Sequence, residues 1–152
     1  MKLAHYLEEN KLKTFMELYS QLSGDLYDRL GIQLAELEIF PEKKSLQLRF
    51  VPPTWYQAHP EMVHGGLVCT LCDTLAGILS LVFAVSEGKV VYTKNMSIDF
   101  LKPVRIEKPC DISASIVSSE EGRDLVHFDI IGLGDMRLVS GEAVFAKKPI
   151  SL

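Results

Sequence analysis

A histidine and two glycines stand immediately before the most apolar stretch of the chain, and one carboxylate lies inside that stretch. His64, Gly65 and Gly66 precede it, and Asp73 is the single charged residue within positions 67–85. A carboxylate seldom occupies an apolar segment unless a partner or a reaction uses it. Two interpretations of Asp73 are open. It either hydrogen-bonds neighbouring backbone groups, or it lies in a cleft as a catalytic carboxylate.

The start of the apolar stretch has the features of a site for negative charge. The backbone N–H groups in the first turn of a helix have no intrahelical partner, and they carry a partial positive charge. Gly65 and Gly66 allow a ligand to approach this backbone closely. The pattern suits an anion, or a carbonyl oxygen that becomes negative during a reaction. We expect His64 to fix this loop through hydrogen bonds rather than to act as a base.

The spacing between these groups predicts a site that two chains share. Gly65 and Asp73 are eight positions apart, which is about 12 Å along a helix. A donor to the oxyanion and a base must both lie within about 3 Å of the reacting atoms, directly or through one water. One helix cannot easily meet that condition. Two antiparallel helices can place the start of one beside the middle of the other, so we expect a two-fold dimer.

The element that positions these residues is predicted to be one long buried helix. Its small and apolar residues leave no strongly polar side, so it must lie in a protein core or in a membrane. A membrane span is disfavoured because Asp73 would be costly there. The apolar positions recur at helical spacing, at Leu67, Leu71, Leu75, Ile78, Leu79 and Val82.

The remaining segments predict an α+β domain in which an antiparallel sheet wraps around this helix. Residues 2–21 have an amphipathic helical pattern, and we assign residues 1–24 to an N-terminal helical extension, followed by a short turn over residues 25–30. A hairpin is expected over residues 31–51, with Leu34, Leu37 and Ile39 on its first strand. After the helix, apolar residues alternate with period two in four strands, around residues 90–100, 110–116, 126–130 and 136–145.

Length, charge and cysteine content limit the class of protein. The 152 residues fit one domain, residues 1–152, with a sizeable core. A net charge of −4 gives no indication of nucleic-acid binding. Three cysteines argue against a disulfide framework. Cys69 and Cys72 lie inside the apolar helix and are interpreted as small hydrophobes rather than metal ligands. With no apolar leader segment, we expect a cytoplasmic protein without metal, redox cofactor or membrane partner.

Together these motifs resemble a known family. The His64-Gly65-Gly66 triplet, the correctly spaced Asp73 and a strand ending in IDFLKP at residues 98–103 resemble the PaaI-type acyl-CoA thioesterases of the hotdog superfamily. The local similarity runs from about residue 59 to 103, and the strand pattern extends it to about residue 148. The resemblance implies the hotdog fold, an acyl-CoA substrate, and a homo-oligomer that is a dimer or a dimer of dimers.

The resemblance also implies roles for individual residues. Asp73 would be the nucleophile or the general base, and a backbone N–H of Gly65 or Gly66 would hold the thioester oxygen. Thr93 stands where some relatives have a hydroxyl that positions the attacking water, although a threonine in a strand is also simply a β-former. Four cations near a strand end would either meet the phosphates of coenzyme A or form a solvated rim; they are Lys94, Lys102, Arg105 and Lys108.

The loop before the helix departs from the family pattern. Relatives often carry an asparagine where this chain has Ala58, and a glycine where it has Glu61. Either the loop takes a different path, or Gln57 or His59 supplies the missing substrate contact. The expected function is therefore acyl-CoA hydrolysis. The alternative, which Ala58 favours, is a non-catalytic acyl-CoA-binding hotdog module, and a hotdog dehydratase is a weaker third interpretation because its His and Glu pair is not apparent.

Overall fold

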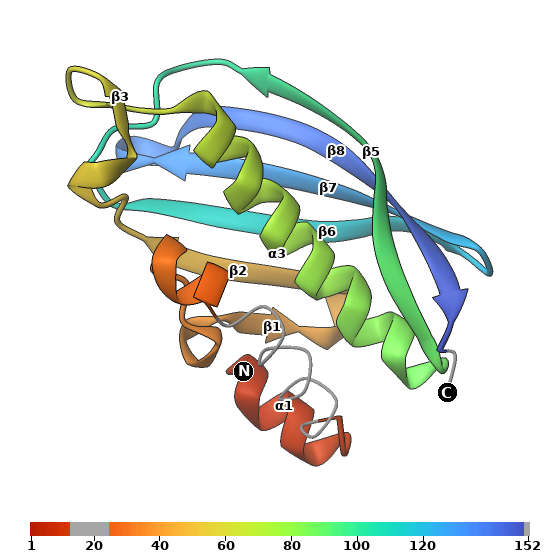
Figure 1. Ribbon diagram of the computed structural model, residues 1–152. Helices are drawn as coiled ribbons and strands as arrows, with labels where there is room; N and C mark the ends of the chain where they lie inside the picture. Colours follow the sequence, from red (N-terminus) through yellow and green to blue (C-terminus); the bar gives the residue numbers. More distant parts are fainter. Residues whose placement is uncertain (13–24, 151–152) are drawn as a thin grey trace.

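The computed structural model of the protein describes residues 1–12 and 25–150. A six-stranded antiparallel sheet curves around one long helix, α3, which spans Gly65–Ser86 (Figure 1). Neighbouring strands follow the order β1-β2-β6-β7-β8-β5. The α+β hotdog architecture expected from the sequence is confirmed, with α3 lying across the concave face of the sheet.

The strands after α3 lie where the alternating pattern predicted them. Strands β6, β7 and β8 form a meander, and β5 adds to the free side of β8, so that β1 and β5 are the two edges of the sheet. The strands are β1 (Glu38–Phe40), β2 (Ser45–Phe50), β5 (Lys89–Phe100), β6 (Cys110–Glu120), β7 (Arg123–Gly132) and β8 (Met136–Pro149). A separate two-stranded hairpin, β3 (Gln57–His59) and β4 (Met62–Val63), leads into α3.

The N-terminal part differs in detail from the expectation. Helix α1 spans Leu3–Glu9 and packs beside β1, with Leu3 and Leu7 buried. Residues 25–30 are helical rather than a short turn. The part of the expected amphipathic helix beyond residue 12 lies outside the described residues. Short 3-10 helices occur at Leu34–Glu36, Pro41–Lys43, Thr54–Tyr56 and Leu133–Asp135.

The first hairpin strand is shorter than predicted. Leu34 lies in a 3-10 helix and Leu37 directly follows that helix, so Ile39 alone of the three predicted residues lies on β1. The reason is visible in the burial pattern, because Leu37 and Ile39 are fully buried two positions apart whereas Leu34 breaks that alternation. The hairpin itself is confirmed, since β1 pairs with β2 in antiparallel register.

Alternate residues of β6, β7 and β8 face α3 and form the core with it. Residues of the two neighbouring strands pack closely against Gly141 of β8. An added Cβ atom there would lie 2.6 Å from the Phe128 ring and 2.3 Å from the Ser97 carbonyl oxygen. Only glycine fits at that position. The helix ends at Glu87, and Gly88 follows with φ of 72°, the left-handed conformation that glycine adopts readily at the end of a helix.

Helix α3 is long and apolar enough to span a membrane. Among residues 1–12 and 25–150 it is the one helix with this length and composition. In the fold, 61% of its apolar window is buried. Central helices of protein cores commonly have this composition, because apolar residues surround a helix that is covered on most sides.

Candidate active site

His64 organises the start of α3. It is the N-cap residue, and its Nδ1 atom accepts a hydrogen bond from the Gly66 N–H at 3.0 Å. The carbonyl oxygen of His64 accepts from the amides of Leu67 and Val68. Within the described residues, the Gly65 N–H has no hydrogen-bond partner. The sequence did not distinguish between the amides of Gly65 and Gly66 as ligand donors. In the structure, the Gly65 amide is the one available to a ligand.

Asp73 lies two turns further along α3 and is held by a residue of β5. The hydroxyl Oγ1 of Thr93 donates a hydrogen bond to Asp73 Oδ1 at 2.8 Å. The register of β5 against β8 shifts between Thr93 and Asn95, and bulges of this kind re-aim side chains near functional sites. Among residues 1–12 and 25–150, the other carboxylate oxygen, Oδ2, has no partner. The structure thus brings together two residues that were singled out separately in the sequence.

A small cavity opens beside Asp73. Its volume is about 150 Å³. Its walls come from α3, from strands β5 and β8, and from the helical residues 25–30. The lining residues are Leu26, Tyr27, Asp73, Thr74, Gly77, Ile78, Val91 and Phe145. Apart from Asp73, Thr74 and the Tyr27 hydroxyl, this surface is apolar.

A second cavity, of about 320 Å³, adjoins Gly65. It is lined by the β3–β4 hairpin, the start of α3 and the segment that follows β5, and it includes His59, His64, Phe100 and Lys102. It shares Lys102, Pro103 and Val104 with a third cavity of about 330 Å³. Lys102, Arg105 and Lys108 line that third cavity, so three of the four cations noted in the sequence gather there.

The structure places some of the other predicted substrate-contact residues at the cavities and others away from them. His59 lines the cavity at Gly65, as does Ala58, whereas Gln57 does not. Lys94 is exposed in the middle of β5 and lines none of the three cavities. Arg105 is already paired, because its Nη1 atom lies 3.2 Å from Glu61 Oε2.

The backbone at Glu61 accounts for one departure from the family pattern. Glu61 has φ of 63°, a left-handed conformation that glycine adopts without strain and other residues adopt at a cost of about 1–2 kcal/mol. Its carbonyl oxygen accepts from the Ile106 amide, and its side chain pairs with Arg105. The turn therefore keeps a backbone conformation that favours glycine, and the Arg105 contact ties the substituted residue to the segment after β5.

Cys72 and Cys110 are buried in the core, whereas Cys69 is partly exposed on α3. Burial raises the pKa of the Cys110 thiol to about 12, and it raises the pKa of the Cys72 thiol further. Both thiols are therefore protonated near neutral pH. In the part of the chain that the structure describes, no group of three or more His, Cys, Asp or Glu residues is placed to hold a metal ion.

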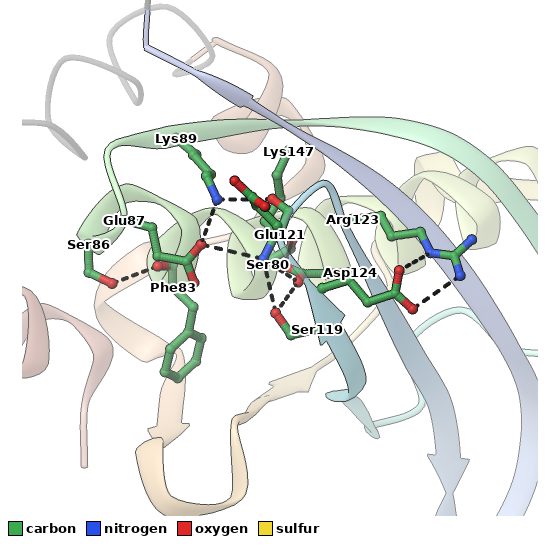
Figure 2. Close-up of polar contacts among 11 residues, drawn as sticks. Ser80, Phe83, Ser86, Glu87, Lys89, Ser119, Glu121, Arg123, Asp124 and Lys147 are labelled. Atoms are coloured by element: carbon green, nitrogen blue, oxygen red, sulfur yellow. Dashed lines mark hydrogen bonds and ion pairs between the residues drawn. The ribbon is translucent and has the colours of Figure 1, made fainter.

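A buried polar cluster was missed by the sequence analysis. Figure 2 shows Asp124 of β7 and Lys147 of β8 meeting beneath the second half of α3. Asp124 Oδ1 lies 3.2 Å from Lys147 Nζ, and Asp124 Oδ2 accepts from Ser80 at 2.6 Å. Ser119 donates to Asp124 and accepts from Lys147. The alternation of β7 could have indicated this cluster, because it places Asp124 on the same buried face as Val126 and Phe128.

Known proteins support this interpretation of the fold. Residues 61–130 match the family model described as Thioesterase superfamily. Acyl-coenzyme A thioesterase THEM4 of Rattus norvegicus is 32% identical over 126 residues, which cover 80% of this chain and 50% of the relative. The chain thus spans about half the length of the mammalian relatives it matches.

Two solved structures share the fold. The PaaI protein of E. coli superimposes with a TM-score of 0.73 at 14% identity, covering 93% of this chain and 96% of that one. A Streptococcus mutans protein, smu.793, bound to acetyl CoA, superimposes with a TM-score of 0.66 at 18% identity, covering 77% of this chain and 90% of that one.

The curved sheet around α3 is that of a hotdog protein with a carboxylate in the middle of the central helix. The chain is similar to proteins of the thioesterase superfamily.

Proposed function

We propose that the chain hydrolyses the thioester bond of acyl-coenzyme A to a free acid and coenzyme A. One observation carries the proposal. The Asp73 carboxylate is fixed by Thr93 through one oxygen, while its other oxygen is unpartnered within the described residues at the edge of an apolar cavity. A held carboxylate with a free oxygen is suited to accept a proton from water. The names of the rat and mouse relatives, both acyl-coenzyme A thioesterases, agree with this chemistry.

The reaction follows from the positions of two groups. The Gly65 N–H would stabilise the negative charge that develops on the thioester oxygen. With Asp73 as general base, Oδ2 takes a proton from water as the water oxygen bonds to the carbonyl carbon. The C–S bond then breaks, and the coenzyme A thiolate takes up the proton. Asp73 could instead attack the carbonyl carbon directly and expel the coenzyme A thiolate as the C–S bond breaks, giving a transient anhydride that water hydrolyses. Both routes remain alternatives.

The site requires a second copy of the chain. Gly65 and Asp73 lie on one continuous helix, about 12 Å apart along its axis, which is too far for both to serve one thioester. Strand β5 is a long edge strand, Lys89–Phe100, and an unpaired edge of this length is a template for another strand. Antiparallel pairing of two β5 strands about a two-fold axis would set the start of one α3 beside the middle of the other. We therefore propose a homodimer with two shared sites, alone or as half of a dimer of dimers.

The cavity at Gly65 and the cavity that shares three of its lining residues offer a route for coenzyme A. They share the lining residues Lys102, Pro103 and Val104, and the cavity that does not include Gly65 is lined by Lys102, Arg105 and Lys108. Cationic side chains are favourable partners for phosphate groups. The pantetheine arm would pass the Gly65 cavity, and the phosphates would meet Lys102 and Lys108. The acetyl CoA bound to the Streptococcus mutans protein supports this class of ligand. We further propose that the enzyme works in the cytoplasm, where thiols such as its three cysteines stay reduced.

A hydrolysis screen tests the function. Purified protein is incubated with short, long and aromatic acyl-CoAs, and the released thiol is measured with a thiol reagent. The proposal expects thiol release from at least one class. Tight acyl-CoA binding without thiol release from any substrate would contradict it and would favour the non-catalytic binding module, the alternative that Ala58 supports.

A further inference from the structure

The cavity beside Asp73 is small for a ligand site. Its volume of about 150 Å³ is comparable to that of an apolar protein cavity that binds one benzene molecule, whereas pockets for larger ligands are about 300–1,000 Å³. Phe145 and Ile78, at 1% and 2% exposure, form fixed walls because both are also part of the core. Tyr27, at 8% exposure, closes the cavity from the N-terminal segment.

We propose that this cavity receives the acyl group, that it admits compact acyl groups of about six carbons, and that Gly77 sets this limit. The inference rests on the proposed function, since it assigns the acyl part of the same substrate.

Gly77 is placed to control the cavity. It follows Asp73 by one helical turn, so both residues lie on the same face of α3. A Cβ atom added at Gly77 would lie 3.5 Å from Phe145 Cε1, which is ordinary van der Waals contact. Alanine therefore fits the folded protein without strain. Its methyl group would nevertheless occupy space between the carboxylate and the ring that an acyl chain needs.

Val91 forms the opposite wall. It precedes Thr93 by two positions on β5, and alternate residues of a strand share a face. Thr93 reaches Asp73 from that face, so Val91 lies on the same side one step further from the carboxylate. Replacing Val91 by alanine should therefore enlarge the cavity, whereas Gly77→Ala should reduce it.

The test compares chain-length profiles in two independent readouts. Affinities are measured for S-alkyl-CoA thioethers with two to twelve carbons, which cannot be hydrolysed, and kcat/KM is measured for the matching acyl-CoAs. Two control variants change the same side-chain types outside the cavity. Gly122→Ala has open space around its new methyl group, and Val90→Ala is the neighbour of Val91 that does not line the cavity.

We expect wild-type affinity and turnover to fall beyond about six carbons. Gly77→Ala should lower both by about tenfold or more for the longest chain that wild type accepts, while the two-carbon compound is little changed. Val91→Ala should extend the accepted length, and the controls should reproduce the wild-type profile.

The outcomes separate the two proposals. If the thioether profile is unchanged in both cavity variants, or if chains of ten to twelve carbons bind wild type as tightly as short ones, the acyl assignment of this cavity is overturned. If the profile shifts as expected but no acyl-CoA is hydrolysed, the cavity assignment stands and the proposed hydrolase function fails.

Discussion

Thr93 on the edge strand β5 and Asp73 in the middle of α3 are joined by a hydrogen bond of 2.8 Å. The bond couples the orientation of the carboxylate to the strand that we propose pairs with a second copy. Thr93 also stands where the register of β5 against β8 shifts. A change in the pairing of β5 would therefore alter the orientation of the Asp73 carboxylate. Dimer formation and the geometry of the site would then depend on one another.

The carboxylate of Asp73 should be essential for turnover. Asp73→Asn keeps the size of the side chain and the hydrogen bond with Thr93 but cannot accept a proton from water. We expect kcat to fall by at least about 100-fold, the lower range for the loss of a general base. The measurement is thiol release at saturating acyl-CoA, with far-UV circular dichroism as the control for folding. Turnover near the wild-type rate in the folded variant would show that the catalytic assignment is wrong.

The Thr93 hydroxyl should act by positioning that carboxylate. Thr93→Val removes the donor at nearly constant volume, and a hydrogen bond to a charged group contributes about 1.5–3 kcal/mol. We expect kcat to fall by about tenfold or more with little change in KM. Thr93→Ser retains the hydroxyl and should recover most of the activity. Equal losses in the valine and serine variants would instead indicate that only the packing of the threonine methyl group matters.

The sequence predicted the helix and the four later strands well, because a long apolar run and strict alternation each allow few structures. Leu34 was misplaced because a single leucine does not distinguish a strand from a 3-10 helix. The Asp73 and Thr93 pairing required the fold, since the two residues are 20 positions apart and meet only when β5 packs on α3.

Two features of the structure could not be predicted from local sequence patterns. Only the folded structure shows that His64 accepts a hydrogen bond from the Gly66 amide and leaves the Gly65 amide open. The Asp124–Lys147 pair joins residues 23 positions apart on neighbouring strands. A charged residue at an inward position of a strand was the available signal, but its partner is fixed by the register of β7 against β8.

His59 and Gln57 should differ in their effect on substrate binding. His59 lines the cavity at Gly65, and Gln57, two residues earlier on β3, does not. We expect His59→Ala to raise KM for acyl-CoA by about three- to tenfold, the loss associated with one exposed hydrogen bond. Gln57→Ala serves as the matched control and should leave KM unchanged. The reverse order of effects, or no effect from His59→Ala, would mean that this side of the cavity contributes shape alone.

The buried Lys147 should matter for stability far more than a surface cation. Its side chain is 2% exposed, and removing it leaves the Asp124 carboxylate buried without its ion-pair partner. Lys147→Met should lower the free energy of unfolding by about 3–5 kcal/mol. Arg123→Ala breaks an exposed ion pair with Glu120 and should cost less than about 1 kcal/mol. Urea unfolding at one fixed protein concentration measures both.

A second substitution identifies the source of that cost. Asp124→Asn removes the charge but keeps an amide that can hydrogen-bond Ser80 and Ser119. In the Lys147→Met background it should therefore restore part of the lost stability, because no uncompensated charge remains buried. If the double variant is less stable than Lys147→Met by the full cost of Asp124→Asn alone, the two residues act independently and the ion-pair explanation is wrong.

Mixed dimers should show whether one site is built by two chains. Asp73→Asn removes the carboxylate, and Gly65→Pro removes the available amide hydrogen. Proline is tolerated at the first position of a helix, and the preceding His64 has φ of −59° and ψ of 129°, which is the region that a following proline requires. An added Cβ atom at Gly65 lies 3.7 Å from the Phe100 ring, which is an ordinary van der Waals contact. Each variant alone should be inactive and folded.

Refolding the two variants together produces heterodimers in which a shared site behaves differently from a site within one chain. If the Gly65 amide of one chain serves the Asp73 of the other, each heterodimer has one doubly damaged site and one intact site. Activity should then return to about half of the wild-type value per heterodimer, provided that the sites act independently. If both groups act within one chain, every site in the mixture carries one lesion and no activity returns. Heterodimers are quantified with distinct affinity tags, so that an inactive preparation of confirmed heterodimers would exclude the shared site.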